Sequence, residues 1–183
     1  MRKRRIAIVV GSKSDLSQCR DGLKFLKSCP DAEVTGVFIR SQHRNTIETQ
    51  DLLRGLVEDD VDVAIIGAGW ANHLTGCCDA FLRYTLRTAK IPIIGVAFED
   101  EKETRRETDT RHNIAAITSM TEVPGTQVKY RDNTEQVFSG SPGFRRACEA
   151  AMGELPDIKL PEPKAIFNFS LDEALELASA EPV

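Results

Sequence analysis

The sequence predicts an α/β fold with a parallel sheet, and three observations support this class. Apolar segments alternate with helical patterns through the first half of the chain, the order expected of parallel strands joined by right-handed helical crossovers. Some of these apolar segments, including the first one in the chain, have no polar residue at alternate positions, which is typical of strands covered on both faces. The chain has 183 residues, of which 41% are hydrophobic and 28% charged, which is typical of one globular domain.

The first strand is expected at Arg5–Val10, where every residue after the arginine is apolar. The polar segment Gly11–Asp15 ends it. A helix should follow and end before Pro30, because apolar residues recur there at three- and four-residue spacings. These residues are Leu16, Cys19, Leu23 and Leu26.

The same alternation continues to residue 98. Strands are expected at Glu33–Ile39, Val61–Ile66 and Ile91–Phe98, and helices at Ile47–Val57 and Leu74–Leu86.

The pattern is less regular beyond this point. Glu99–Arg111 carries dense charge of both signs without apolar periodicity, so it is either a solvated loop or a mobile lid. A helix over His112–Met120 and a short strand around Gln127–Tyr130 should follow. Ser141-Pro142 has the form of an N-cap with proline at the first helical position, which predicts a helix from there to Met152.

The last part of the chain is expected to be an arm. Leu155–Pro163 contains three prolines and predicts an extended linker, and Ser170–Glu173 is a capping-box sequence that opens a short amphipathic helix. Such a helix cannot easily be buried against its own chain, so it is expected to reach a neighbouring subunit. The division is therefore an α/β domain at 1–154 and a linker with a terminal helix at 155–183.

Composition excludes several classes of function. The formal net charge of −4 argues against nucleic acid as a partner, and the basic cluster Met1–Arg5 is interpreted as a solvated terminus. No apolar run approaches the ~20 residues of a membrane span, and no signal peptide is recognisable, so a cytoplasmic protein is expected. The five cysteines form no C-x-x-C pair and are interpreted as reduced thiols rather than metal ligands: Cys19, Cys29, Cys77, Cys78 and Cys148.

Three polar segments follow the first three strands, at the sheet edge where α/β proteins bind ligands. The first, Gly11–Asp15, offers free backbone N–H groups, a helix N-terminus and the Ser12 and Ser14 hydroxyls, which suit a phosphate. Asp15 would repel a phosphate and should bind a sugar hydroxyl or the helix N-terminus. From this loop alone, a helix cap formed by Ser14 is an equally good interpretation. The Walker A spacing is absent.

The second segment, Ser41–Arg44, places an anion-binding fork at Arg44 beside His43, a side chain that exchanges protons near neutral pH. The third, Gly67–His73, is rich in glycine, so its backbone can approach a flat ligand closely. Trp70 there either stacks on a ligand or packs the loop, with packing slightly favoured. His73 either caps the following helix or faces the pocket.

Together the motifs Gly11–Asp15, Ser41–Arg44 and Gly67–Gly76 resemble the PurE family, the aminoimidazole ribonucleotide carboxylases and N5-carboxyaminoimidazole ribonucleotide mutases of purine synthesis. Their order and spacing match over about Ile6–Val96 and more weakly to Met152. Gln42 replaces the usual alanine, Asn45-Thr46 replaces Thr-Pro, and Trp70 and Asn72 replace small residues. His73-Leu74 is closer to the mutase type.

The resemblance implies a flavodoxin-like three-layer α/β/α sandwich, assembled as a homo-octamer in which the C-terminal helix contacts neighbours. It implies that the ribose phosphate is held by Ser12, Ser14, Asp15, Ser41 and Arg44. It also implies contacts with the imidazole and carboxylate, largely through backbone, from Gly69, Asn72 and Leu74, and a general acid/base at His43. Gly11 and His73 complete the expected substrate-binding set.

The implied reaction is a mutase reaction. The carboxylate leaves N5 of the ribonucleotide as CO2 and is attached to C4, without metal or cofactor. A direct carboxylase that uses CO2 remains an alternative on the same residues. After Val96 the family's Gln-Met-Pro loop is Ser119–Thr121, and its Gly-Ala-x-Asn motif is Gly140–Gly143. These departures keep open a divergent paralogue that binds another phosphorylated metabolite.

Overall fold

The computed structural model describes residues 2–99, 112–123 and 125–179. Its strands are β1 (Arg4–Val10), β2 (Ala32–Ile39), β3 (Val63–Ala68) and β4 (Ile93–Ala97). They pair in parallel in the order β2-β1-β3-β4. The helices are α1 (Leu16–Ser28), α2 (Thr46–Glu58), α3 (His73–Ala80), α4 (His112–Thr121), α5 (Gly140–Met152) and α6 (Leu171–Ser179), with a 3-10 turn η1 (Lys13–Asp15) and a π-helical turn η2 (Phe81–Thr85). Residues 100–111 of the expected loop or lid lie outside the described part.

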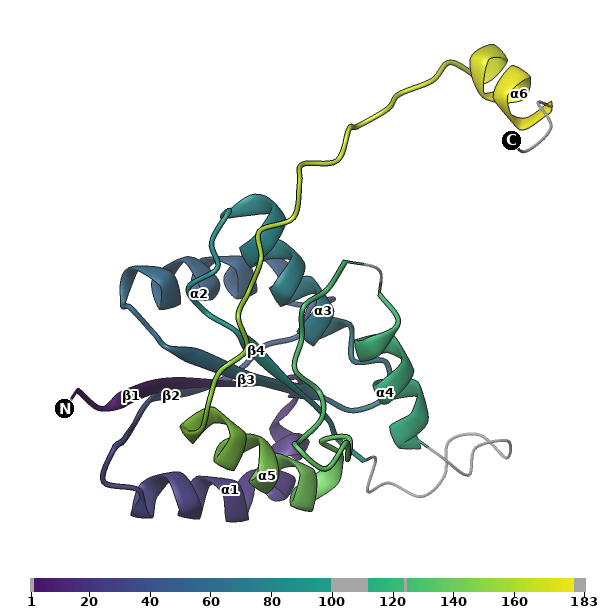
Figure 1. Ribbon diagram of the computed structural model, residues 1–183. Helices are drawn as coiled ribbons and strands as arrows, with labels where there is room; N and C mark the ends of the chain where they lie inside the picture. The colour runs from purple at the N-terminus through teal and green to yellow at the C-terminus, as the bar shows by residue number, and fades with distance from the viewer. Residues whose placement is uncertain (1, 100–111, 124, 180–183) are drawn as a thin grey trace.

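Helices cover both faces of the sheet, α1 and α5 on one side and α2 and α3 on the other (Figure 1). The side chains of β1 divide accordingly: Ile6 and Ile8 belong to the core beneath α1 and α5, while Ala7 and Val9 belong to the core beneath α2 and α3. Burial on both faces is why this strand is continuously apolar in sequence. The three-layer flavodoxin-like sandwich is therefore confirmed.

Segment 127–130 lies beside β4, as expected, but makes only an isolated bridge. The Gly95 N–H donates to the Lys129 carbonyl and the Lys129 N–H to the Ile93 carbonyl, each at 2.9 Å. The next residue, Tyr130, does not continue this pairing with β4, because its carbonyl accepts the Phe138 N–H at 2.9 Å. The segment therefore lies where the strand was predicted, but it does not form a regular strand paired with β4.

A buried ion pair holds this segment in place. Arg83 and Asp79 are both fully buried, with Nε and Oδ1 3.1 Å apart. The guanidinium also donates to the carbonyls of Thr88 and Ile91, each at 2.7 Å, while Asp79 Oδ2 accepts the Gln127 N–H at 2.7 Å. Burial lowers the pKa of Arg83 from its ordinary value, and the Asp79 charge opposes that shift. The pair joins η2, the loop before β4 and the segment at 127.

Helix α5 begins earlier than the sequence suggested. Its N-cap is Ser139, not Ser141, and its first turn is closed by the Gly143 N–H donating to the Ser139 carbonyl at 3.0 Å. Pro142 consequently lies third in the helix. A proline is tolerated there because the N–H groups of the first turn have no partner within the helix.

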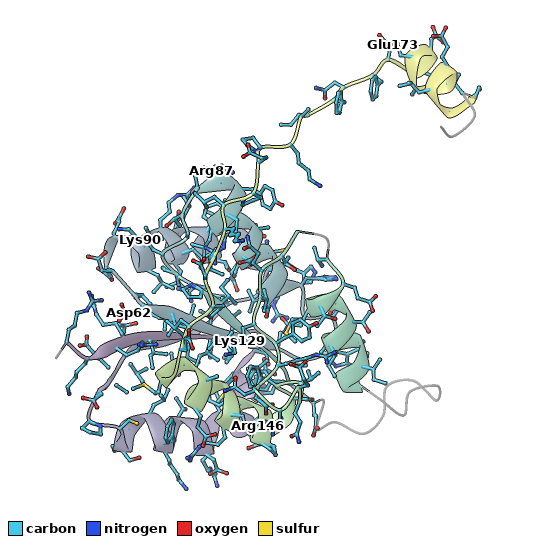
Figure 2. The ribbon with its side chains drawn as sticks, in the orientation of Figure 1. Asp62, Arg87, Lys90, Lys129, Arg146 and Glu173 are labelled. Carbon is cyan, nitrogen blue, oxygen red and sulfur yellow. The ribbon has the colours of Figure 1, made fainter. Side chains whose placement is uncertain are left out.

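The C-terminal arm extends away from the sandwich and ends in α6 (Figure 1). The predicted capping box is confirmed: the Ser170 N–H donates to the Glu173 carboxylate at 2.8 Å, and the Glu173 N–H donates to Ser170 Oγ at 3.3 Å. Figure 2 labels Glu173 on α6, far from the body, and Arg87 where the arm leaves it. Arg87 donates to the Pro161 carbonyl at 2.6 Å.

In the described part of the chain, no helix is long and apolar enough to cross a membrane.

Candidate functional site

A cavity of about 540 Å³ lies at the carboxyl ends of β1 and β3. This is the point where the strand order reverses and ligands bind in doubly wound sheets. Gly11 lets the two strand ends meet, since its N–H donates to the Gly67 carbonyl at 3.0 Å and an added Cβ would lie 2.8 Å from the Cβ of Ala68. The lining residues are Gly11, Ser12, Ser14, Asp15, Gln18, Ser41, Gln42, His43, Arg44, Ala68, Gly69, Trp70, Ala71, Leu74 and Glu99.

The first loop forms a capping box around η1. Ser12 is the N-cap: its Oγ accepts the Ser14 N–H at 3.1 Å, and its own N–H donates to the Asp15 carboxylate at 2.8 Å. The two serine hydroxyls are also hydrogen-bonded to each other. The expected cap at Ser14 is thus wrong, because Ser12 performs that role. Asp15 binds the helix N-terminus, one of the two partners anticipated for it, and both hydroxyls still line the cavity.

The second loop is a turn that exposes its two functional side chains. The N–H groups of Arg44 and Asn45 donate to the Ser41 carbonyl at 3.1 and 2.8 Å. His43 and Arg44 are exposed at the cavity. Within the described ranges, no hydrogen bond or ion pair engages the Arg44 guanidinium, so it can bind an anionic ligand.

The second and third loops meet at a pair of histidines. His43 Nε2 and His73 Nδ1 lie 3.4 Å apart, and the rings are edge-to-face with centroids 5.6 Å apart. One nitrogen donates and the other accepts, and the tautomers decide which. His73 is the first residue of α3, so the helix start fixes the partner of His43. His73 itself is not among the lining residues.

Asn72 holds the third loop rather than lining the cavity. It is fully buried and caps α3, with its Oδ1 accepting from the Thr75 N–H at 3.2 Å and its Nδ2 donating to the Val96 carbonyl at 3.0 Å. Its backbone N–H donates to Ser119 Oγ at 2.6 Å. These groups are engaged inside the chain and are not offered to a ligand. Helix α4 spans His112–Thr121, which confirms the helix expected over His112–Met120. Ser119–Thr121, which the resemblance matched to the family's Gln-Met-Pro loop, forms the end of this helix, and Met120 is buried.

The remaining wall comes from Gly69, Trp70 and Leu74. Trp70 has a φ of +56° and is 41% exposed. The sequence slightly favoured packing of the loop for Trp70, and more than half of the residue's surface is covered. The rest is exposed at the cavity, where a ligand can reach it.

Sequence reasoning missed two residues at the cavity, Gln18 and Glu99. Gln18 is buried on α1, and its side-chain amide makes two hydrogen bonds with the backbone of Glu99: Nε2 donates to the carbonyl at 2.7 Å and Oε1 accepts the N–H at 3.0 Å. A glutamine on the inward face of a helix was the available signal for this contact. The pair fixes the end of β4 beside the first loop.

Carboxylates and a cation therefore line the same cavity, Asp15 and Glu99 together with Arg44. In the ranges that the structure describes, no group of three or more His, Cys, Asp or Glu side chains is arranged to hold a metal ion.

Comparison with known proteins identifies the family. Residues 5–131 match the family model described as AIR carboxylase. The chain belongs to this family, which is the PurE family. The match includes all three loops of the cavity and ends before α5.

The N5-carboxyaminoimidazole ribonucleotide mutase of Thermotoga maritima is 28% identical over 122 residues, which cover 66% of this chain and 61% of that protein. Among solved structures, Treponema denticola PurE has a TM-score of 0.51 at 15% identity, covering 81% of this chain and 89% of that one. A variant of PurE2 from the same organism has a TM-score of 0.50 at 19% identity, covering 70% of each chain. These structures support the fold.

Proposed function

We propose that the chain is an N5-carboxyaminoimidazole ribonucleotide mutase of purine biosynthesis. Membership of the PurE family and the similarity to the Thermotoga maritima mutase support a role in this chemistry. The observation that carries the proposal is a cavity whose lining combines an anion-binding group, Arg44, three serines and a histidine paired with a second histidine.

The phosphate would bind at the end of the cavity formed by the first two loops. Arg44 supplies an exposed guanidinium, and Ser12, Ser14 and Ser41 supply hydroxyl groups. Asp15 is bound to the Ser12 N–H, so its role is to hold the loop in the conformation that places Ser12 at the cavity. Gly11 would allow the ligand close to the backbone.

His43 would act as the general acid and base. When the N5–carboxyl bond breaks, CO2 is released and N5 takes a proton from His43. C4 then attacks the retained CO2, and His43 recovers a proton from C4, so that the overall reaction is an isomerisation. A histidine with a reference pKa of ~6.5 suits both transfers near neutral pH. His73, 3.4 Å from the His43 ring, would orient it, and the apolar Leu74 and Gly69 would help to retain CO2.

Direct carboxylation of aminoimidazole ribonucleotide is a second candidate, because the matching family model carries that description and the same groups would serve. Initial rates with N5-carboxyaminoimidazole ribonucleotide, and with aminoimidazole ribonucleotide plus bicarbonate, separate the two. We expect faster turnover of the first substrate without ATP. Faster turnover of the second would make the chain a carboxylase. Acceleration of neither would refute both and leave a metabolite-binding paralogue.

The arm suggests the quaternary structure. Helix α6 has no buried residue, and Leu171 and Leu175 are 75% and 56% exposed. Exposed apolar surface of this kind marks an interaction site. We propose that α6 packs on a neighbouring subunit of a homo-octamer.

A further inference from the structure

The wall of the cavity contains an aromatic side chain that the proposed reaction does not use. Trp70 lies in the loop after β3, between Gly69 and Ala71, and all three line the cavity. It is the one tryptophan in the sequence. Trp70 belongs to the third loop, whereas the serines proposed to bind the phosphate belong to the first two loops.

The conformation of Trp70 is unfavourable for a residue that only fills space. Its φ of +56° is left-handed, which costs a side chain with a Cβ about 1–2 kcal/mol. The residue is also 41% exposed, although a tryptophan stabilises a fold mainly through the large area that it buries. Strained backbone of this type is concentrated at ligand-binding sites.

The glycine next to Trp70 is not required by packing. A Cβ added to Gly69 would meet no atom nearer than the Phe98 carbonyl oxygen at 3.5 Å, whereas a Cβ at Gly67 would lie 2.6 Å from the Phe98 ring. Packing therefore explains the glycine at position 67 but not the one at 69. Gly69 and Trp70 both line the cavity, and a flat ligand can approach the backbone of a glycine closely.

We propose that the Trp70 indole stacks on the planar heterocycle of the ligand and is a specificity-determining residue at the ring end of the cavity. This inference rests on the proposed function, which identifies the heterocycle as the aminoimidazole ring. Stacking of a base on an aromatic side chain is worth about 1–3 kcal/mol. It favours ribonucleotides with a ring over ribose phosphates without one.

The single tryptophan makes a direct test possible. Aminoimidazole ribonucleotide should change the intrinsic fluorescence on binding, and ribose 5-phosphate should bind, as measured by calorimetry, with little fluorescence change. Trp70→Ala should weaken aminoimidazole ribonucleotide binding about 5–100-fold and leave ribose 5-phosphate binding unchanged. Trp70→Phe should restore most of the affinity.

Trp70→Gly separates ligand binding from stability. Glycine accepts the positive φ, so this variant should melt no lower than the Trp70→Ala variant and still lose ring affinity. Wild-type affinity for aminoimidazole ribonucleotide in Trp70→Ala would overturn the stacking role while the proposed function survives. Failure of the wild-type protein to bind either compound would overturn the proposed function and, with it, this inference.

Discussion

Asp15 and Arg44 lie at the same cavity with opposite charges, and their hydrogen bonds distinguish their roles. The Asp15 carboxylate accepts the Ser12 N–H within its own loop. Arg44 lines the cavity, and its guanidinium makes no hydrogen bond or ion pair with residues 2–99, 112–123 and 125–179. The aspartate therefore holds the loop together, and the arginine is the charge that a phosphate would meet.

Arg44→Met should consequently impair substrate binding. A hydrogen bond to a charged group is worth about 1.5–3 kcal/mol, so we expect KM for the ribonucleotide to rise about 10–100-fold, with a smaller change in kcat. Arg20→Met is the matched control, because Arg20 is an exposed arginine of α1 that does not line the cavity. Equal KM values for the two variants would contradict the assignment.

The cysteines provide a second prediction at this scale. Burial, with a smaller contribution from Asp15, raises the pKa of Cys19 to about 12, and burial also raises the pKa of Cys78 and Cys148. Cys77 is exposed and Cys29 half-buried. A thiolate is the reactive form, and partial burial also raises the pKa of Cys77. At pH 8 Ellman's reagent should therefore label Cys29 first, Cys77 more slowly, and the other thiols only after unfolding. Rapid labelling of all the cysteines in the folded protein would contradict this burial.

At the level of elements, α1 and α5 approach closely enough to require a glycine. A Cβ on Gly22 would lie 2.5 Å from the Phe144 ring and 2.8 Å from Cys148 Sγ. Gly55, within α2, has no atom within 4 Å of such a Cβ. Helix propensity favours alanine over glycine at both positions, so packing should decide the difference.

Gly55→Ala should stabilise the protein by about 0.5–1 kcal/mol. Gly22→Ala should destabilise it by about 1 kcal/mol, because overpacking of about 1–3 kcal/mol exceeds the gain in helix propensity. The free energy of unfolding in urea measures both. Stabilisation by both substitutions would show that α1 and α5 are further apart than described.

The regular elements were predictable where one periodicity dominates. The continuous run of β1 and the three- and four-residue spacing in α1 identified both elements. The start of α5 was predicted wrongly because Pro142 is compatible with more than one position in the first helical turn. The irregular pairing at Lys129 depends on the buried Asp79–Arg83 pair, a long-range contact that no local pattern reports.

The site was predictable to the extent that topology alone determines it. Loops after neighbouring parallel strands must meet at one sheet edge, which is why the sequence could place Ser12, His43 and Gly69 in one cavity. The engagement of Asn72 by Ser119 could not be foreseen, since it depends on how α4 packs. The left-handed backbone of Trp70 likewise has no sequence signature.

For the whole molecule, the arm leads to a prediction about assembly. If α6 packs on a neighbour, replacing Leu171 and Leu175 by serine should reduce the oligomer size measured by light scattering after gel filtration. The control replaces the polar pair Asp172 and Glu176 on the same exposed helix by serine. An unchanged mass for the leucine variant would exclude an essential role for α6 in assembly.

The central claim is that His43 transfers protons to and from a ribonucleotide held in this cavity. The most direct measurement is kcat for N5-carboxyaminoimidazole ribonucleotide with the wild-type chain and with His43→Asn, supported by equal melting temperatures. General acid–base catalysis contributes about 10²–10⁴-fold, so kcat should fall by that factor without ATP or metal in the assay. A His43→Asn variant that turns over at the wild-type rate would contradict the account.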